Sequence, residues 1–270
     1  MSTDTKTIHE FLAENPDVDV SKAWERCFGI LGGIKDQIAS RFPVERHPEC
    51  KGREYYTSPD GAFEGSFNAY TGTDVEWLVH SWLGNRKASI LDMNATCFLG
   101  QSTDTPHLIV IFGTIPKLFF YADYVPRKDL RTDTDYLDKY YGGDANTDFL
   151  KLRGDPNFHW SVSHGTYMRA LLSPLALSIA GELNEANIDK LETYAKSFVA
   201  RWLGWLDKPQ IVPAGERAEL QRYDHRVRSL GYQRDPMNSL AEKVFGADQV
   251  ENMIRMRMGA AQMEASRIYK

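Results

Sequence analysis

Closely spaced β-rich segments between residues 54 and 126 constrain the fold of this 270-residue chain more than any other feature. They are rich in β-branched and aromatic residues, and turn-forming runs such as Ser58-Pro59-Asp60-Gly61 separate them. Parallel neighbours need long crossovers, so these short links require antiparallel pairing. We therefore predict a central antiparallel sheet of about six to seven strands. The segments are Glu54–Thr57, Ala62–Tyr70, Val75–Leu83, Lys87–Leu99, His107–Thr114 and Lys117–Tyr124.

Helical patterns lie before and after this block. Ser21–Phe42 and Glu185–Leu206 carry apolar residues at helical spacing, and the second is the strongest helix pattern in the chain. Strands in one block with helices on either side predict an α+β fold whose sheet is covered by helices, in a single domain over residues 1–270. Further helices are predicted at Thr134–Tyr141, Asn146–Leu152, Ser163–Leu172, Gly215–Leu230, Ser239–Phe245 and Ala247–Met258.

The segment Lys87–Leu99 has two unlike faces, because side chains alternate along a strand. One face, here the apolar face, includes Leu91, Met93, Ala95 and Cys97. The other, here the mixed face, carries Ile90, Asp92, Asn94, Thr96 and Phe98. A mixture of this kind is typical of the floor of a ligand pocket. Asp92 and Asn94 can hydrogen-bond a polar ligand or donate a proton, and a purely structural polar pair is the alternative.

Composition and charge exclude several classes of function. The net charge of -5 argues against a nucleic-acid binder, which needs a basic surface. Three scattered cysteines build neither a disulfide framework nor a zinc site, and the seven histidines lack metal-ligand spacing. Neither a membrane span nor a secretory leader is predicted, and Met1–Glu14 is polar and acidic. We expect a cytoplasmic protein, or one of the plastid stroma if a transit peptide has been removed.

Two segments have the chemistry for a site or a partner. His159, in the stretch Phe158–His164 predicted as a loop running into a helix, is a candidate proton donor, because histidine titrates near neutral pH. A solvated loop histidine is the alternative. The segment Gly215–Asp235 is locally basic on an acidic protein, which would steer an acidic partner; internal salt bridges are the other explanation.

An ordered set of short motifs between Val75 and Asp235 resembles the red chlorophyll catabolite reductase family, plant enzymes of chlorophyll breakdown. The first sixty residues match the family poorly. The motifs are Val79-His80-Ser81-Trp82, Ile90-Leu91-Asp92, Phe98–Pro106, Pro126-Arg127-Lys128-Asp129-Leu130, Asp135–Tyr141, Arg169 and Ser173-Pro174.

The resemblance implies an α/β/α sandwich around an antiparallel sheet, shared with the ferredoxin-dependent bilin reductases. It also implies an oxidoreductase that acts on CH–CH groups without a bound metal or flavin. Reduced ferredoxin would supply single electrons to an open-chain tetrapyrrole held between the sheet and the C-terminal helices, and acidic side chains would supply protons. Ferredoxin is acidic and suits the basic segment. A homodimer remains an open alternative for the assembly.

The resemblance also assigns site residues, with one departure. A family acid on the strand matching Leu108–Phe112 falls at Ile111, which cannot transfer a proton, whereas a second family acid matches Asp235. We therefore predict Asp235 as the proton donor, acting alone or with Asp92, His107 or His159 in place of the missing acid. Asn94, His107, Ile111 and Ser163 are predicted to contact substrate, and Arg127 or Arg169 to pair with its propionate-like carboxylates.

Two other functions fit the same scaffold. Ile111 favours a non-redox isomerase or cyclase of a conjugated natural product, because an apolar wall can fold a substrate without reducing it. A pigment-binding protein, in which the pocket persists without chemistry, is the third hypothesis.

Overall fold

The computed structural model describes residues 6–7, 18–88, 90–115 and 117–268. Within these ranges the chain forms one ten-stranded sheet in the order β1-β9-β10-β8-β7-β6-β5-β4-β2, with β3 paired to β4. The predicted α+β class and antiparallel sheet are confirmed. The strands are β1 (Lys6–Thr7), β2 (Glu45–Arg46), β3 (Tyr56–Thr57), β4 (Glu64–Thr71), β5 (Val75–Asn85), β6 (Ile90–Leu99), β7 (His107–Ile115), β8 (Lys117–Val125), β9 (Phe158–Val162) and β10 (Leu177–Gly181).

The sheet is wider than predicted because the chain returns to it after the helices that follow β8. β10 pairs antiparallel with β8 and β9 pairs antiparallel with β10, while β1 pairs parallel with β9. The prediction of a loop at Phe158–His164 was wrong over β9. Phe158 and Trp160 alternate there with polar residues, and Phe158 is buried while Trp160 packs on the core, so the segment completes the sheet.

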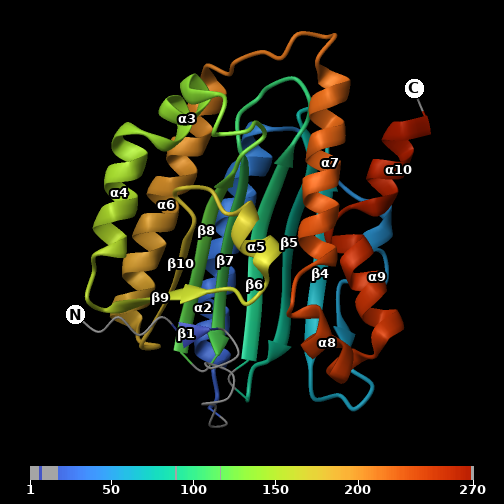
Figure 1. Cartoon of the computed structure of the whole chain (residues 1–270). Helices are drawn as coiled ribbons and strands as arrows, with labels where there is room; N and C mark the ends of the chain where they lie inside the picture. Colours follow the sequence, from blue (N-terminus) through green and yellow to red (C-terminus); the bar gives the residue numbers. More distant parts are fainter. Residues whose placement is uncertain (1–5, 8–17, 89, 116, 269–270) are drawn as a thin grey trace.

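The apolar face of the sheet packs against α2 and α6 and forms the large core of the protein. In Figure 1, α2 runs behind the strands. Trp24 of α2 meets the edge of Trp82 on β5, and Phe198 of α6 stacks on Tyr124 of β8 with ring centroids 3.7 Å apart. Aromatic burial of this kind supplies much of the free energy of folding. The helices on this side are α2 (Ser21–Arg41), α3 (Thr134–Tyr141), α4 (Gly143–Arg153) and α6 (Glu185–Asp207).

The mixed face is covered by the C-terminal helices and one short helix. Figure 1 shows α5 and α7 in front of the sheet, opposite α2, so the helices lie on both faces as expected. Phe98 of β6 and Trp77 of β5 share a cluster with Met256 of α9. The helices on this side are α5 (Thr166–Leu171), shorter than predicted, α7 (Arg217–Gln233), α8 (Asn238–Phe245), α9 (Ala247–Arg257) and α10 (Ala260–Ile268).

The polar segment Met1–Glu14 lies outside the described residues, apart from β1. None of the helices in the described ranges has the length and apolar character needed to cross a membrane.

Candidate active site

On the mixed face, one side chain from each of six neighbouring strands lies in a row across the sheet, here called the polar row. Strand register and a hydrogen bond connect its members, and all except Ile111 carry polar side chains. Asn94 donates to the Ser81 hydroxyl over 2.9 Å, and the hydroxyls of Ser161 and Ser178 are 2.7 Å apart. Ile111, predicted to contact substrate, therefore makes an apolar gap in a polar row. From β5 to β9 the row is Ser81, Asn94, Ile111, Tyr121, Ser178 and Ser161.

The structure brings together two of the predicted catalytic acids, Asp92 and Asp235. Asp92 on β6 accepts a hydrogen bond from Arg257 of α9 over 2.6 Å. Asp235, just before α8, accepts one from the Met237 amide over 2.9 Å. Burial raises the pKa of Asp235, and the neighbouring Asp92 adds to this effect while Arg257 opposes it. A carboxyl group with a raised pKa beside a second acid suits proton donation.

A further acid on the mixed face, Asp123 of β8, was not predicted. Its Oδ2 accepts from the Tyr121 hydroxyl over 3.0 Å and from the Ser173 amide over 3.3 Å. Its Oδ1 is buried without a hydrogen-bond partner among the described residues. Burial raises the pKa of Asp123 to about 6, which the donors of Ser173 and Tyr121 only partly offset. A carboxylate at an alternate position in an apolar strand was the signal that could have identified it.

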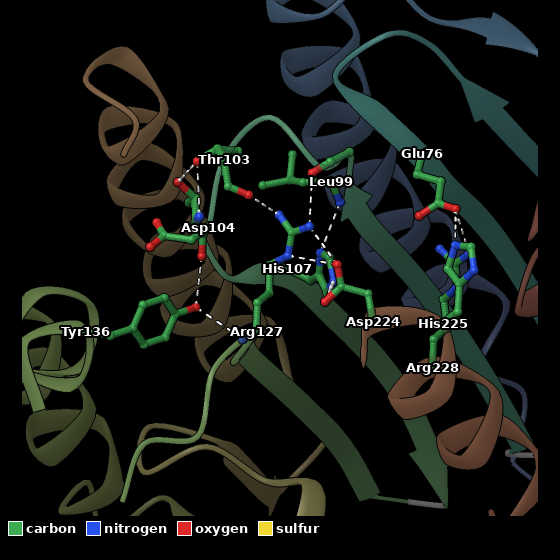
Figure 2. A network of polar contacts seen from close by, with 12 residues as sticks. Glu76, Leu99, Thr103, Asp104, His107, Arg127, Tyr136, Asp224, His225 and Arg228 are labelled. Atoms are coloured by element: carbon green, nitrogen blue, oxygen red, sulfur yellow. Dashed lines mark hydrogen bonds and ion pairs between the residues drawn. The ribbon is translucent and has the colours of Figure 1, made fainter. Parts of the chain in front are cut away.

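His107 and Arg127 lie in a buried network with Asp224 of α7, shown in Figure 2. Arg127 donates from Nε and Nη2 to Asp224 Oδ2, from Nη1 to the Thr103 carbonyl and from Nη2 to the Gly100 carbonyl. Burial alone would raise the pKa of Asp224, but the charge of Arg127, with His107 beside it, lowers it to about 2. The guanidinium is committed to protein acceptors, which argues against its predicted pairing with a substrate carboxylate.

The ring of His107 is likewise held by protein groups. Its Nδ1 accepts from the Leu99 amide over 3.0 Å, and its Nε2 lies 3.3 Å from Asp224 Oδ1. Burial lowers the pKa of His107 because the imidazolium form loses its hydration. These contacts favour a structural role over the predicted contact with substrate.

A second buried network ties α7 to β5 (Figure 2). His225 Nε2 hydrogen-bonds Glu76 Oε1, and Arg228 Nη2 lies 3.5 Å from the same oxygen. The Arg228 guanidinium sits 4.7 Å from the centroid of the Phe98 ring. The arginines of the basic segment predicted at Gly215–Asp235 therefore differ in their exposure to solvent. Some of its arginines, such as Arg228, are buried, and others, including Arg222 and Arg226, are exposed.

The remaining predicted site residues lie on β9, on α5 and in the loop between them. His159 is exposed on β9. The Ser163 hydroxyl accepts from the Gly165 amide over 3.2 Å. Arg169 of α5 is exposed and donates to the carbonyls of Ser163 and His164. The segment that carries Ser163 and Arg169 packs against the chain around Asp235, because a Cβ at Gly165 would lie 3.1 Å from Pro236 and the Arg234 guanidinium lies 5.3 Å from the centroid of the Tyr167 ring. Among the described residues, no cluster of His, Cys, Asp and Glu side chains could hold a metal ion.

Comparison with known proteins places the chain in a family. The family model for red chlorophyll catabolite reductase matches residues 37–257. The chain belongs to the red chlorophyll catabolite reductase family. The chloroplastic reductase of Arabidopsis thaliana is 28% identical over 242 residues, covering 81% of this chain and 74% of that protein. The chloroplastic reductase 1 of Oryza sativa subsp. japonica is 28% identical over 200 residues, covering 68% and 60% respectively. Both relatives are chloroplastic, so they give no support to the expected cytoplasmic location.

A solved structure shares the fold. Phytochromobilin synthase from tomato, in complex with biliverdin, superposes with a TM-score of 0.74 at 16% identity. The match covers 87% of this chain and 84% of that one. The predicted likeness to the bilin reductase fold is confirmed.

Proposed function

We propose that this protein reduces a double bond of an open-chain tetrapyrrole of the red chlorophyll catabolite class. Family membership supports this assignment, as does a fold shared with a protein that binds the linear tetrapyrrole biliverdin. The observation that carries the proposal is the pair of Asp92, on the mixed face, and Asp235, just before α8, where burial raises the pKa of Asp235.

The reaction needs two electrons and two protons for each double bond reduced. Reduced ferredoxin carries one electron, so two ferredoxins serve one turnover. The conjugated substrate accepts the electrons directly, without a bound cofactor. Asp235 then protonates the reduced substrate, while Asp92 and Asn94 contact it from β6. Arg169 stays a predicted partner for a substrate carboxylate, since its side chain is exposed on α5, which covers the same face.

Exposed cations on α7 support ferredoxin as the donor. Arg222 and Arg226 are exposed on that helix, and Arg234 follows it with its side chain also exposed. Positive charges grouped on and just after one helix attract an acidic protein and speed its association. Raising the salt concentration should then slow electron transfer from ferredoxin more than it slows reduction by a small chemical reductant.

The test is an anaerobic absorbance time course with red chlorophyll catabolite, and separately with biliverdin. Each pigment is mixed with the protein in the presence and absence of reduced ferredoxin. Loss of the conjugated band only with ferredoxin is the expected result. Product formed without any electron donor would instead support the isomerase or cyclase, which the apolar Ile111 favours. A shifted band that persists under every condition would support a pigment-binding protein.

A further inference from the structure

The side chains of Tyr121 and Asp123 form a pair that the reduction described above does not use. They occupy alternate positions of β8 and so share the mixed face. Tyr121 is half-buried in the polar row, whereas Asp123 is only 1% exposed. The Tyr121 hydroxyl and Asp123 Oδ2 are 3.0 Å apart. The pair therefore connects a buried carboxyl group to the polar row of the mixed face.

The position of this pair along the sheet is specific. Tyr121 lies directly across from Ile111 of β7, and Asp123 lies across from Ile109. Asp123 is thus a diagonal neighbour of Ile111, at about 7–8 Å between the strands. Ile109 and Ile111 are apolar and half-buried, so neither can act as a competing proton donor on that part of β7. An acid and its hydroxyl partner consequently sit beside the gap in the polar row.

We propose that Asp123 and Tyr121 form a proton relay, in which Asp123 holds the proton and Tyr121 passes it to the substrate. This relay deepens the reductase function proposed above and rests on it. Asp235 supplies one of the two protons, and the relay supplies the other.

The relay balances in atoms and charge. Once the substrate has taken an electron from ferredoxin, the Tyr121 O–H bond breaks and a new bond to hydrogen forms on the substrate. In the same event the Asp123 O–H bond breaks and its proton moves to the Tyr121 oxygen. Asp123 ends as a carboxylate that accepts a hydrogen bond from Tyr121, which is the contact present in this structure. Water reloads the pair after the product leaves.

The surroundings of the pair favour a relay over either residue alone. Burial and the neighbouring Asp123 raise the pKa of Tyr121 well above its ordinary value, so a lasting tyrosinate is unfavourable. Tyr121 must therefore regain a proton as it gives one up. Asp123 can supply it because its raised pKa keeps the carboxyl group partly protonated near pH 6. Besides Tyr121, the groups that hydrogen-bond Asp123 come from Ser173 and Tyr124, and its charge reaches Tyr141 and Tyr194.

The experiment follows single turnovers of the full-length protein with red chlorophyll catabolite and reduced ferredoxin, without oxygen. Absorbance reports pigment binding and product, and electron paramagnetic resonance reports the one-electron-reduced substrate. We expect Tyr121→Phe and Asp123→Asn to bind the pigment and form the radical. Its decay to product should slow about 100-fold, in line with the loss of a general acid. The double variant should be no slower than the slower single variant, because the two residues act as a unit.

The chain offers a matched control in a second tyrosine–aspartate pair. Tyr140 of α3 donates to the buried Asp104 over 3.0 Å, away from the mixed face. Tyr140→Phe likewise removes a hydroxyl that donates to an aspartate, and it should leave turnover unchanged. Tyr121→Phe removes only an oxygen, so it keeps the test decisive if Asp123→Asn does not fold.

The outcomes separate the relay from the proposed function. In the wild type, turnover should fall as the pH rises above about 6, and this dependence should vanish in Asp123→Asn. Wild-type turnover matched by both variants, with the same pH profile, would overturn the relay and leave the reductase standing. Loss of pigment binding in both variants would also overturn it, by giving the pair a binding role. A wild type that never reduces the pigment would remove both proposals.

Discussion

Replacing Asp123 by asparagine should change how the stability of this protein depends on pH. In the folded protein the pKa of Asp123 is raised from 3.8 to about 6, mainly by burial. The folded state therefore keeps this proton to a higher pH than the unfolded chain. Between about pH 4 and pH 6 the unfolded state binds fewer protons, so rising pH favours unfolding.

The size of the effect follows from the two pKa values. The difference between 3.8 and about 6, at roughly 1.4 kcal/mol for each pKa unit, is about 3 kcal/mol. Wild-type protein should lose this contribution to its free energy of unfolding as the pH rises from 4 to 7. Asp123→Asn has no proton to lose and should not. The new amide group also changes stability, but by an amount that is independent of pH.

Urea unfolding, followed by tryptophan fluorescence, measures both proteins between pH 4 and pH 8. The difference in free energy of unfolding, variant minus wild type, should rise by about 3 kcal/mol over this range. Asp129→Asn is the control, because the pKa of that exposed carboxyl is held at about 2 by hydrogen bonds from Arg131. It is ionised in the folded state throughout the range and in the unfolded state above about pH 5, so its difference from wild type should stay nearly constant. A constant difference for Asp123→Asn as well would refute the raised pKa.

Three further changes test other parts of the structure. Arg127→Met leaves Asp224 as a buried charge without its guanidinium, so the free energy of unfolding at pH 7 should fall by about 3–5 kcal/mol; a loss below about 1 kcal/mol in urea titrations would contradict the network. Gly259→Ala places a Cβ 2.8 Å from the Trp77 ring at a φ of 66°, so we expect a clear fall in thermal midpoint; an unchanged midpoint would show that Trp77 can move aside. Asp235→Asn should bind red chlorophyll catabolite as tightly as wild type but turn it over about 100-fold more slowly; equal turnover in absorbance assays would remove Asp235 from the mechanism.

The sequence predicted the centre of the sheet well because its information is local. β5 begins at Val75 and β6 ends at Leu99, as the alternation of side chains indicated. Short turns fixed the antiparallel order of β4 to β8 without knowledge of distant contacts. The division of β6 into an apolar and a mixed face was also available, since a period of two determines it.

The edges of the sheet and the charged networks could not be predicted in the same way. β9 and β10 are short, and β10 joins β8 only after three intervening helices and a further strand. Arg127 is separated from Asp224 by 97 positions, so nothing local shows that its charge is neutralised within the protein. Arg127 was therefore predicted as a ligand for substrate, a role that its buried contacts argue against. Asp123, by contrast, was accessible to the same alternation argument that identified Asp92.

The two networks that fasten α7 determine which side of the molecule can open. Asp224, His225 and Arg228 anchor three positions of that helix to buried partners on the sheet or just after β8, so lifting it would expose several charges at once. Beside α7, the short helix α5 has no buried side chain, and its Arg169 donates only to the carbonyls of Ser163 and His164, which lie just before the helix. Amide hydrogens of α7 should accordingly exchange with solvent only on global unfolding, whereas those of α5 exchange through small local openings. Under the proposed function, the segment that moves to admit a bulky pigment is therefore α5, while α7 stays in place.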